Sequence, residues 1–290
     1  MARRKLSDRQ RQRIAKIQAQ RRTRADQRIV DSLSEQTERM DLHGRVVVRH
    51  GQNLWVRDQQ GQTIHCLFRQ NLGEVVCGDQ VLWQTTGDDQ GVVTAVLTRQ
   101  TTLSRPDYSG RDKPIAANIS QLVVVLAPQP EPTGYLLDQY LVAAELGQMQ
   151  PLICLGKADL MSAAQRQAFV ARFAHYQALG YPIVEISAKS ALGLQPLLQR
   201  LSDQTSILVG QSGVGKSSLI NALLPEQQLQ EGALSDSTGL GRHTTSAATL
   251  YALPSGGEII DSPGVRSFRL GKLDQHDLEQ GYPQISALIG

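Results

Sequence analysis

The feature that most constrains this chain is a glycine-rich segment, residues 210–217, which matches the pattern Gly-x4-Gly-Lys-Ser. A short apolar run, residues 206–209, precedes it, and a helix-like run, residues 218–224, follows it. Glycine lets the backbone bend around phosphate oxygens, so that N–H groups and the N-terminus of the next helix face the anion. In such a loop the lysine, Lys216, reaches the β- and γ-phosphates, and the hydroxyl of Ser217 ligates Mg2+. The segment therefore predicts a strand–loop–helix site for the phosphates of a nucleotide.

Two segments farther along the chain complete the phosphate side. An apolar run ends in Asp261-Ser-Pro-Gly264, in which the aspartate reaches the Mg2+ shell and the glycine N–H meets the γ-phosphate. Between the glycine-rich segment and Asp261, residues 239–246 predict a switch loop. In this loop Thr245 is favoured over Thr244 as the residue that senses Mg2+ and γ-phosphate. The residues expected to bind the phosphates are Gly210, Gln211, Ser212, Gly213, Val214, Gly215, Lys216, Ser217, Ser218, Asp261 and Gly264, and those expected to ligate Mg2+ are Ser217, Thr245 and Asp261.

Two motifs that recognise guanine lie before the phosphate loop, each directly after an apolar run. Residues 155–159, Leu-Gly-Lys-Ala-Asp, approximate the motif Asn-Lys-x-Asp, whose carboxylate pairs with the N1 and N2 hydrogens of guanine. Residues 187–189 are Ser-Ala-Lys, a motif whose backbone N–H meets guanine O6. The residues expected on the guanine side are Lys157, Asp159, Leu160, Ser187, Ala188 and Lys189. The two motifs favour GTP and disfavour an ATPase of the same loop class.

The order of these motifs is rotated relative to the ordinary one, in which the phosphate motifs come first. A sheet can still close in the rotated order, because circular permutation only moves the termini to another surface loop. Apolar strand-like runs alternate with helical stretches from residue 121 onward, which predicts a mostly parallel sheet with helices on both faces. We therefore expect a circularly permuted α/β P-loop GTPase domain over residues 119–273.

The N-terminal part of the chain has a different character. Residues 1–40 are polar and rich in Gln and Arg, and we expect a basic flexible extension there. Residues 41–100 contain five short β-rich runs punctuated by glycines, which predict a small all-β barrel. An OB-fold and an SH3-like barrel both fit that pattern. Residues 101–118 are polar with two prolines, and we expect a linker.

Charge and composition narrow the partners of this 290-residue chain. Residues 1–30 hold eleven Arg and Lys against two Asp and Glu, a net of +9, whereas the whole chain has a net of +3. So concentrated a positive arm favours contact with nucleic acid, with a solvated tail as the alternative. There is no apolar run of the ~20 residues that a membrane span needs. Three scattered cysteines fit reduced thiols in the cytoplasm better than disulfides or zinc ligands.

These motifs in this order resemble the circularly permuted RsgA GTPase family. The likeness runs from about residue 42 to residue 268, and includes Gly-Arg-His-Thr-Thr at residues 241–245 and the segment Asn-Ile-Ser-Gln-Leu-Val-Val-Val from Asn118. The resemblance implies hydrolysis of GTP to GDP and phosphate, stimulation by the small ribosomal subunit, and a role in late maturation of the 30S subunit. It also implies an OB-fold that contacts 16S rRNA, a cytoplasmic protein that acts as a monomer, and a C-terminal zinc domain.

The chain departs from the family pattern in two places. Gly156 stands where the family has the asparagine of Asn-Lys-x-Asp, and the loss of one or two hydrogen bonds predicts nucleotide binding weaker by about 1–3 kcal/mol, roughly 5- to 150-fold. After Leu270 there is no cysteine and only one histidine, His276, so we expect no zinc site in this chain. We interpret residues 274–290 as the start of a C-terminal segment and the chain as a truncation.

The residues around the expected γ-phosphate predict slow turnover without an activator. Val265 follows Asp-x-x-Gly, where a side chain that orients water is needed, and valine cannot do this. His243 is the candidate for orienting the attacking water, although packing of the switch explains it equally well. The expected catalytic residues are His243, Lys216 and Thr245. The alternative function is a nucleotide-sensing rRNA-binding module that hydrolyses little GTP.

Overall fold

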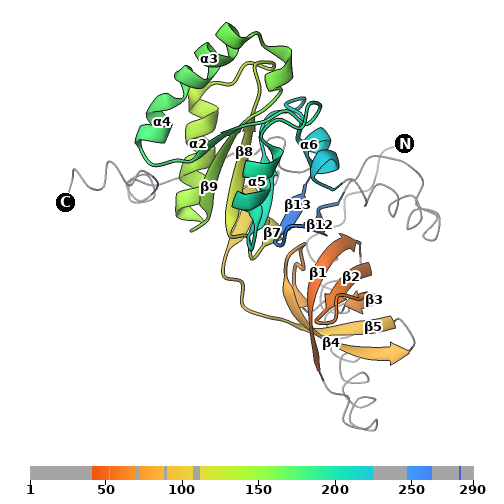
Figure 1. Ribbon diagram of the computed structural model, residues 1–290. Coiled ribbons are helices and arrows are strands. Elements are labelled where there is room, and N and C mark those ends of the chain that lie inside the picture. Colours follow the sequence, from red (N-terminus) through yellow and green to blue (C-terminus); the bar gives the residue numbers. More distant parts are fainter. Residues whose placement is uncertain are drawn as a thin grey trace, which may run out of the picture. The chain divides into compact units, whose positions relative to one another are not determined.

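The computed structural model describes residues 41–51, 53–68, 72–87, 90–106, 112–224, 247–262 and 281 (Figure 1). The described residues from Leu42 onward form one compact unit. Within the described ranges, no helix has both the length and the apolar character required to cross a membrane.

The first part of this unit is a closed five-stranded barrel. Its strands are β1 (Leu42–His50), β2 (Asn53–Asp58), β3 (Thr63–Phe68), β4 (Gln80–Gly87) and β5 (Gln90–Val96). β1 pairs with β2 and β4, β2 with β3, and β5 with β3 and β4, so the strands close on themselves in the order 1-2-3-5-4. Alternate side chains fill the interior, among them Leu54, Val56 and Trp83, because successive residues of a strand face opposite sides. The topology is consistent with the OB-fold alternative.

Residues 101–118, expected to be a linker, contain a two-stranded hairpin of β6 (Thr102–Pro106) and β7 (Asp112–Ala117). Asn118 then ties this hairpin to the barrel: its side chain accepts a hydrogen bond from the Gln100 N–H (2.9 Å) and donates one to the Gly78 carbonyl (3.0 Å). Asn118 adopts a left-handed backbone conformation with φ 54°, which Asn tolerates better than most residues. Residues 101–118 therefore form a hairpin that is hydrogen-bonded to the barrel, and they are not a free connection.

The second part is a mixed, mostly parallel sheet with helices on both faces. Its strands are β8 (Gln121–Leu126), β9 (Gln150–Leu155), β10 (Ile183–Glu185), β11 (Thr205–Val209), β12 (Thr249–Ala252) and β13 (Glu258–Asp261). Its helices are α2 (Gly134–Leu146), α3 (Ala163–Arg172), α4 (Ala174–Ala178), α5 (Leu194–Leu201) and α6 (Lys216–Leu223), with a 3-10 turn, η2 (Ala158–Leu160). The strand order is β10-β9-β8-β11-β13-β12, and only β12 runs antiparallel to its neighbour β13.

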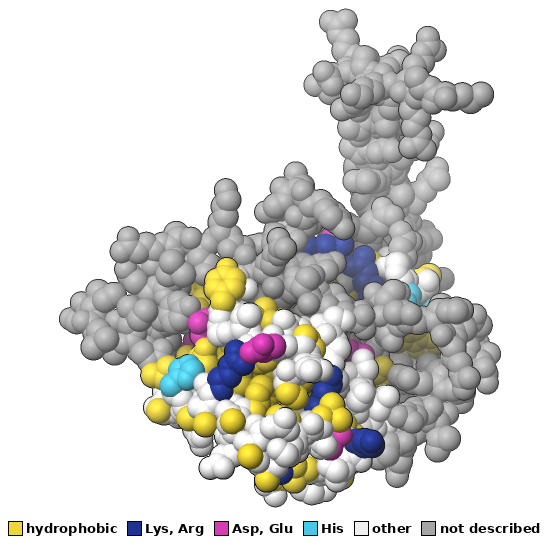
Figure 2. Space-filling view, turned by 90° about the horizontal axis from the view of Figure 1, so that it is seen from above, with side chains coloured by type: hydrophobic (Ala, Val, Ile, Leu, Met, Phe, Trp, Pro, Cys, Tyr) yellow, Lys and Arg dark blue, Asp and Glu magenta, His cyan; other side chains and the backbone are white. Residues whose placement is uncertain are grey.

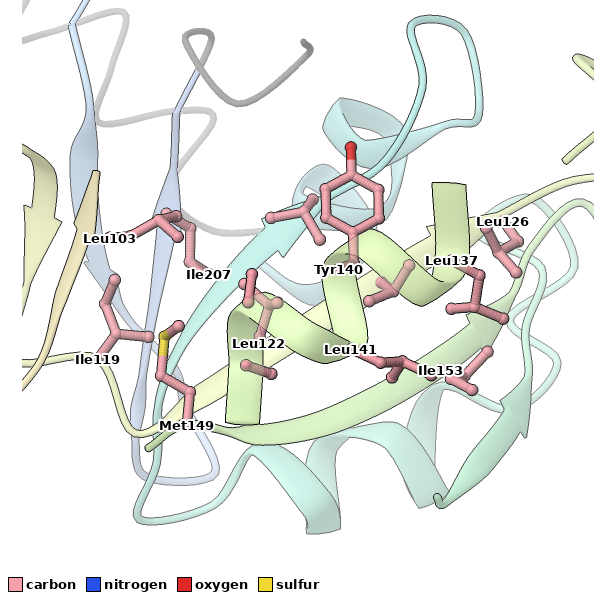
Figure 3. Close-up of a cluster of buried hydrophobic side chains, with 14 of the residues drawn as sticks. Leu103, Ile119, Leu122, Leu126, Leu137, Tyr140, Leu141, Met149, Ile153 and Ile207 are labelled. Atoms are coloured by element: carbon pink, nitrogen blue, oxygen red, sulfur yellow. The ribbon is translucent and has the colours of Figure 1, made fainter. Parts of the chain in front are cut away.

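Two apolar cores lie on opposite faces of this sheet. On one face α2, α3 and α4 pack against the strands, and Figure 3 shows α2 laid over them with Leu137 close to Leu126 and Leu141 close to Ile153. On the other face α5 and α6 pack on the alternate residues of the same strands. All six residues of β8 are buried, because the strand is covered on both faces.

The barrel and this sheet are joined by hydrogen bonds as well as by the chain. Val48 of β1 pairs with Thr249 of β12, so the strands form one continuous run of eleven. Nearby, Arg45 and Arg57 of the barrel form ion pairs with Glu258, the first residue of β13.

Candidate nucleotide-binding site

The phosphate loop lies where the glycine pattern predicts it, between β11 and α6. Gly210, Gly213 and Gly215 have φ values of 137°, 84° and 102°, a backbone region that other residues rarely adopt. A Cβ at position 210 would lie 2.3 Å from the Val125 carbonyl oxygen, so the loop also needs glycine there to pass β8. The strand thus delivers the chain into a tight loop, and α6 begins at its end, so that the N-terminus of a helix faces the loop, as a site for an anion requires.

Lys216 is held inside this loop. The residue is buried, and its Nζ donates to the carbonyl oxygens of Gly210 (2.7 Å) and Gln211 (2.8 Å). A buried ammonium needs such partners, and a phosphate oxygen at the loop centre would offer a charged one. The next two residues, Ser217 and Ser218, are exposed on the first turn of α6.

A buried tyrosine that the sequence motifs did not identify contacts the first residue of the phosphate loop, Gly210. Tyr140 of α2 is 1% exposed, and a backbone hydrogen bond from Gly210 reaches its phenol. Burial raises the pKa of Tyr140, and the hydrogen bond from Gly210 opposes that rise. Figure 3 shows its hydroxyl directed away from the leucines of the cluster. No local pattern would have marked it, because the contact joins helix α2 to a loop some 70 residues later in the chain.

The two guanine-side motifs meet through one short hydrogen bond. The Ser187 hydroxyl donates to Asp159 Oδ1 at 2.6 Å and accepts from the Ser190 N–H at 3.1 Å. Ser187 is fully buried, whereas Asp159 is exposed at the surface, where a base can reach its second oxygen. The backbone of Ala158 also bonds to the Ile186 carbonyl (3.2 Å). Ser187 therefore orients the carboxylate that the sequence singles out for guanine.

The guanine side lies against the phosphate loop at residues 156 and 157. A Cβ at Gly156 would lie 3.6 Å from the Val214 carbonyl oxygen, and a Cβ at Gly215 would lie 3.9 Å from Lys157 Cε. Lys157 adopts a left-handed conformation (φ 57°), and its Nζ donates to the Gln129 carbonyl (2.9 Å). The lysine stem thus covers the loop where a nucleotide would join its base to its phosphates. Of the other guanine-side residues, Leu160 is 65% exposed, Ala188 half-buried and Lys189 exposed.

The described residues offer oxygen donors suited to Mg2+ at this edge of the sheet. Asp261 ends β13, which pairs in parallel with β11, and Ser217 follows the loop that leaves β11. Carboxylate and hydroxyl oxygens are ligands that Mg2+ accepts, usually together with waters and substrate phosphates. The donor set therefore fits the expected ion.

Several expected residues lie outside the described part of the chain. They are His243, Thr244, Thr245, Gly264 and Val265. Of residues 274–290, where the C-terminal segment was expected, the structure describes Gly281, which lies against Val142 of α2.

Comparison with known proteins gives one family. Residues 96–271 match the model of the RsgA GTPase. A protein named small ribosomal subunit biogenesis GTPase RsgA from Alcanivorax borkumensis is 45% identical over 304 residues, which cover 100% of this chain and 85% of the relative. A protein of the same name from Pseudomonas fluorescens strain Pf0-1 is also 45% identical, over 100% of this chain and 87% of its own length.

Two solved structures share the fold. The crystal structure of YjeQ from Thermotoga maritima has a TM-score of 0.68 and 30% identity, covering 84% of this chain and 82% of that one. The structure of YloQ, described as a circularly permuted GTPase, has a TM-score of 0.65 and 28% identity, covering 86% of this chain and 80% of that one. The rotated motif order and its sheet are thus shared with solved proteins.

Proposed function

This chain belongs to the RsgA GTPase family, and we propose that it hydrolyses GTP to GDP and phosphate in late maturation of the 30S ribosomal subunit. Its relatives carry the name small ribosomal subunit biogenesis GTPase. The observation that carries the proposal is the meeting of base and phosphate motifs: Gly156 and Lys157 lie against the phosphate loop, and Ser187 holds Asp159. A guanine at Asp159 and phosphates at the loop are then within reach of one nucleotide.

The chemistry of the proposed reaction is mainly positioning and charge neutralisation. Mg2+ when bound neutralises charge on the β- and γ-phosphates, and we assign Ser217, Asp261 and Thr245 to hold it. Lys216 leaves its carbonyl partners for the phosphate oxygens and adds a second positive charge there. We assign the orientation of the attacking water to His243, since an imidazole both donates and accepts hydrogen bonds near neutral pH.

For the partners, we propose the small ribosomal subunit and its 16S rRNA. The barrel is of the kind whose surface binds RNA, and eleven Arg and Lys lie in residues 1–30. On the face in Figure 2, basic and acidic side chains are interspersed among the described residues, and the sequence itself concentrates basic residues in that arm. We propose a monomer in the cytoplasm, and we assign no zinc ligands within this chain.

A steady-state assay of GTP hydrolysis with and without purified small ribosomal subunits tests the proposal. We expect slow turnover alone and much faster turnover with subunits, with GTP outcompeting ATP for binding. Turnover at background under both conditions, with GTP still bound, would support instead the nucleotide-sensing rRNA-binding module. Gly156 is the observation that favours this second function, because it removes an amide from the base loop.

The role of His243 has its own test. The variant His243→Ala should keep its affinity for GTP and lose subunit-stimulated turnover by about 100-fold or more, since general acid–base and positioning groups contribute roughly 10²–10⁴-fold. Stimulated turnover equal to that of the unmodified chain would reduce His243 to a packing residue of the switch.

A further inference from the structure

Two arginines of the barrel share one carboxylate of the GTPase sheet. Arg45 and Arg57 stand directly opposite each other on β1 and β2, and both guanidinium groups pair with Glu258. All three side chains are largely shielded, with 22%, 21% and 15% exposed. Like charges facing each other across neighbouring strands repel. Glu258 therefore supplies the carboxylate that this pair of arginines needs.

One carboxylate does not balance two guanidinium groups. Burial lowers the pKa of Arg45, and burial followed by the charge of Arg45 lowers the pKa of Arg57. For both arginines burial is the larger cause, and for Arg57 the facing charge of Arg45 adds to it. The Nε of Arg45 is buried and has no hydrogen-bond partner among the described residues. This cluster thus carries one excess positive charge and an unused donor.

The same cluster fixes the starts of the two strands that lead to the phosphate site. The hydroxyl of Thr205, the first residue of β11, contacts Glu258 Oε2 at 3.3 Å and lies 3.1 Å from Arg45 Nη2. Arg45 Nη2 also donates to the Asn118 carbonyl (3.1 Å). β11 ends next to the phosphate loop, and β13 ends at Asp261. Strands of four or five residues span only about 13–17 Å.

We propose that Glu258 is a positioning residue that couples the barrel to the nucleotide site. Held by Arg45 and Arg57, it sets the register of β13 against β11, and so the place of Asp261 relative to the phosphate loop. An RNA phosphate that approaches Arg57 competes with Glu258 for its guanidinium, because a phosphate oxygen forms an equally strong charge-assisted bond. The loss of one arginine from Glu258 shifts the start of β13. The inference rests on the proposed function, in which the barrel meets the RNA of the small subunit.

The test compares Glu258→Gln with a matched control, Glu145→Gln. Glu145 ends helix α2 and accepts a hydrogen bond from the Tyr181 hydroxyl (3.2 Å), away from the barrel arginines. For each full-length variant we would measure GTP affinity, turnover with and without small ribosomal subunits, affinity for those subunits, and the Mg2+ concentration that gives half-maximal turnover. In Glu258→Gln we expect stimulation to fall about tenfold, within the 5- to 150-fold span of typical couplings, and more Mg2+ to be needed. GTP affinity and subunit affinity should stay within about twofold, and Glu145→Gln should match the unmodified chain.

The outcomes separate this inference from the function beneath it. If small ribosomal subunits do not stimulate GTP turnover by the unmodified chain, the proposed function and the coupling are both overturned. Normal stimulation and normal Mg2+ demand in Glu258→Gln would overturn the coupling alone. If thermal melting shows that Glu258→Gln does not fold, Arg57→Ala takes its place, because it leaves Arg45 and Glu258 as a balanced pair. The ratio of stimulated to unstimulated turnover should fall there as well, because Glu258 has already lost Arg57 before RNA arrives, and an unchanged ratio would again refute the coupling.

Discussion

Residue 156 decides how the base loop and the phosphate loop meet. The glycine N–H donates to the Leu126 carbonyl at 2.7 Å, and a Cβ there would lie 3.2 Å from that same oxygen. Any larger residue must therefore push β8 or the base loop by a few tenths of an ångström. An asparagine at this position would place a side-chain amide within reach of the Val214 carbonyl, and the amide could donate a hydrogen bond that a glycine cannot provide.

We predict that Gly156→Asn binds GTP more tightly than Gly156→Ala by about tenfold, the effect of one or two added hydrogen bonds. The alanine variant carries the same Cβ without the amide, so the difference between the two isolates the hydrogen bonds from the steric cost. Titration of a fluorescent GTP analogue gives both constants. Equal affinities would mean that the amide finds no partner in this loop.

Ser187 is a second single residue that supports the proposed base site. The variant Ser187→Ala removes the 2.6 Å donor to Asp159. We predict that GTP affinity falls about fivefold, since a hydrogen bond to a charged group contributes roughly 1.5–3 kcal/mol and water replaces part of it. The affinity for inorganic phosphate should not change, because phosphate does not contact the guanine side. An unaltered GTP affinity in the same titration would show that the Asp159 carboxylate needs no such support.

At the scale of elements, helix α2 contributes to the site without carrying any motif. Its Tyr140 bonds to Gly210, where β11 enters the phosphate loop. A neighbouring tyrosine provides the control: Tyr176 of α4 is also buried, and its hydroxyl donates to Asp138 of α2 at 2.8 Å. One hydroxyl thus contacts the loop, and the other joins helix α4 to helix α2.

We predict that Tyr140→Phe weakens GTP binding about three- to tenfold, because a buried loop N–H loses its acceptor at a cost of roughly 1 kcal/mol. Tyr176→Phe should lower the melting temperature about as much as Tyr140→Phe does, and it should leave GTP binding unchanged. Calorimetric titration together with thermal melting of both variants gives the comparison. Equal binding by the two variants would separate Tyr140 from the site.

The elements also show what the sequence can and cannot predict. Mostly apolar runs predict β8, β9 and β11, because strands buried on both faces have few polar positions, and the glycine spacing predicts the phosphate loop. The sequence does not predict the short strand β12, since Thr249–Ala252 is only four residues long and has no clear alternation. Pro106 and Pro114 normally interrupt strands and therefore favour a linker, but the two-stranded pair of β6 and β7 tolerates them where no hydrogen bond is required. Contacts such as Tyr140 with Gly210 depend on tertiary packing, which no local pattern encodes.

For the whole molecule, three buried thiols make stability depend on pH. Burial raises the pKa of Cys66 and of Cys154 to about 12, and it also raises the pKa of Cys77 above its ordinary value of 9.0. Between about pH 9 and about pH 12 the unfolded chain releases thiol protons that the folded chain retains. The contribution of these thiols to the free energy of unfolding is therefore fully present below pH 9 and is lost as the pH rises from about 9 to about 12.

We predict that the urea midpoint of the unmodified chain falls steadily above about pH 9. In Cys154→Ala the free energy of unfolding should fall less steeply with pH, by the contribution of about one proton. Urea titrations of both chains at matched pH values measure the slopes. Identical slopes would mean that Cys154 ionises equally in the folded and unfolded states.

The pairing of β1 with β12 also has a consequence for self-association. An exposed sheet edge is a template on which another chain can add a strand. Here the outer strand of the GTPase sheet is capped by β1, and β1 belongs to a barrel that closes on itself. At the far end, the described edge strand is β10, only three residues long, with Glu185 paired to Arg166. The barrel thus shields the backbone of the GTPase from strand addition by neighbouring chains, in addition to any part it has in binding RNA.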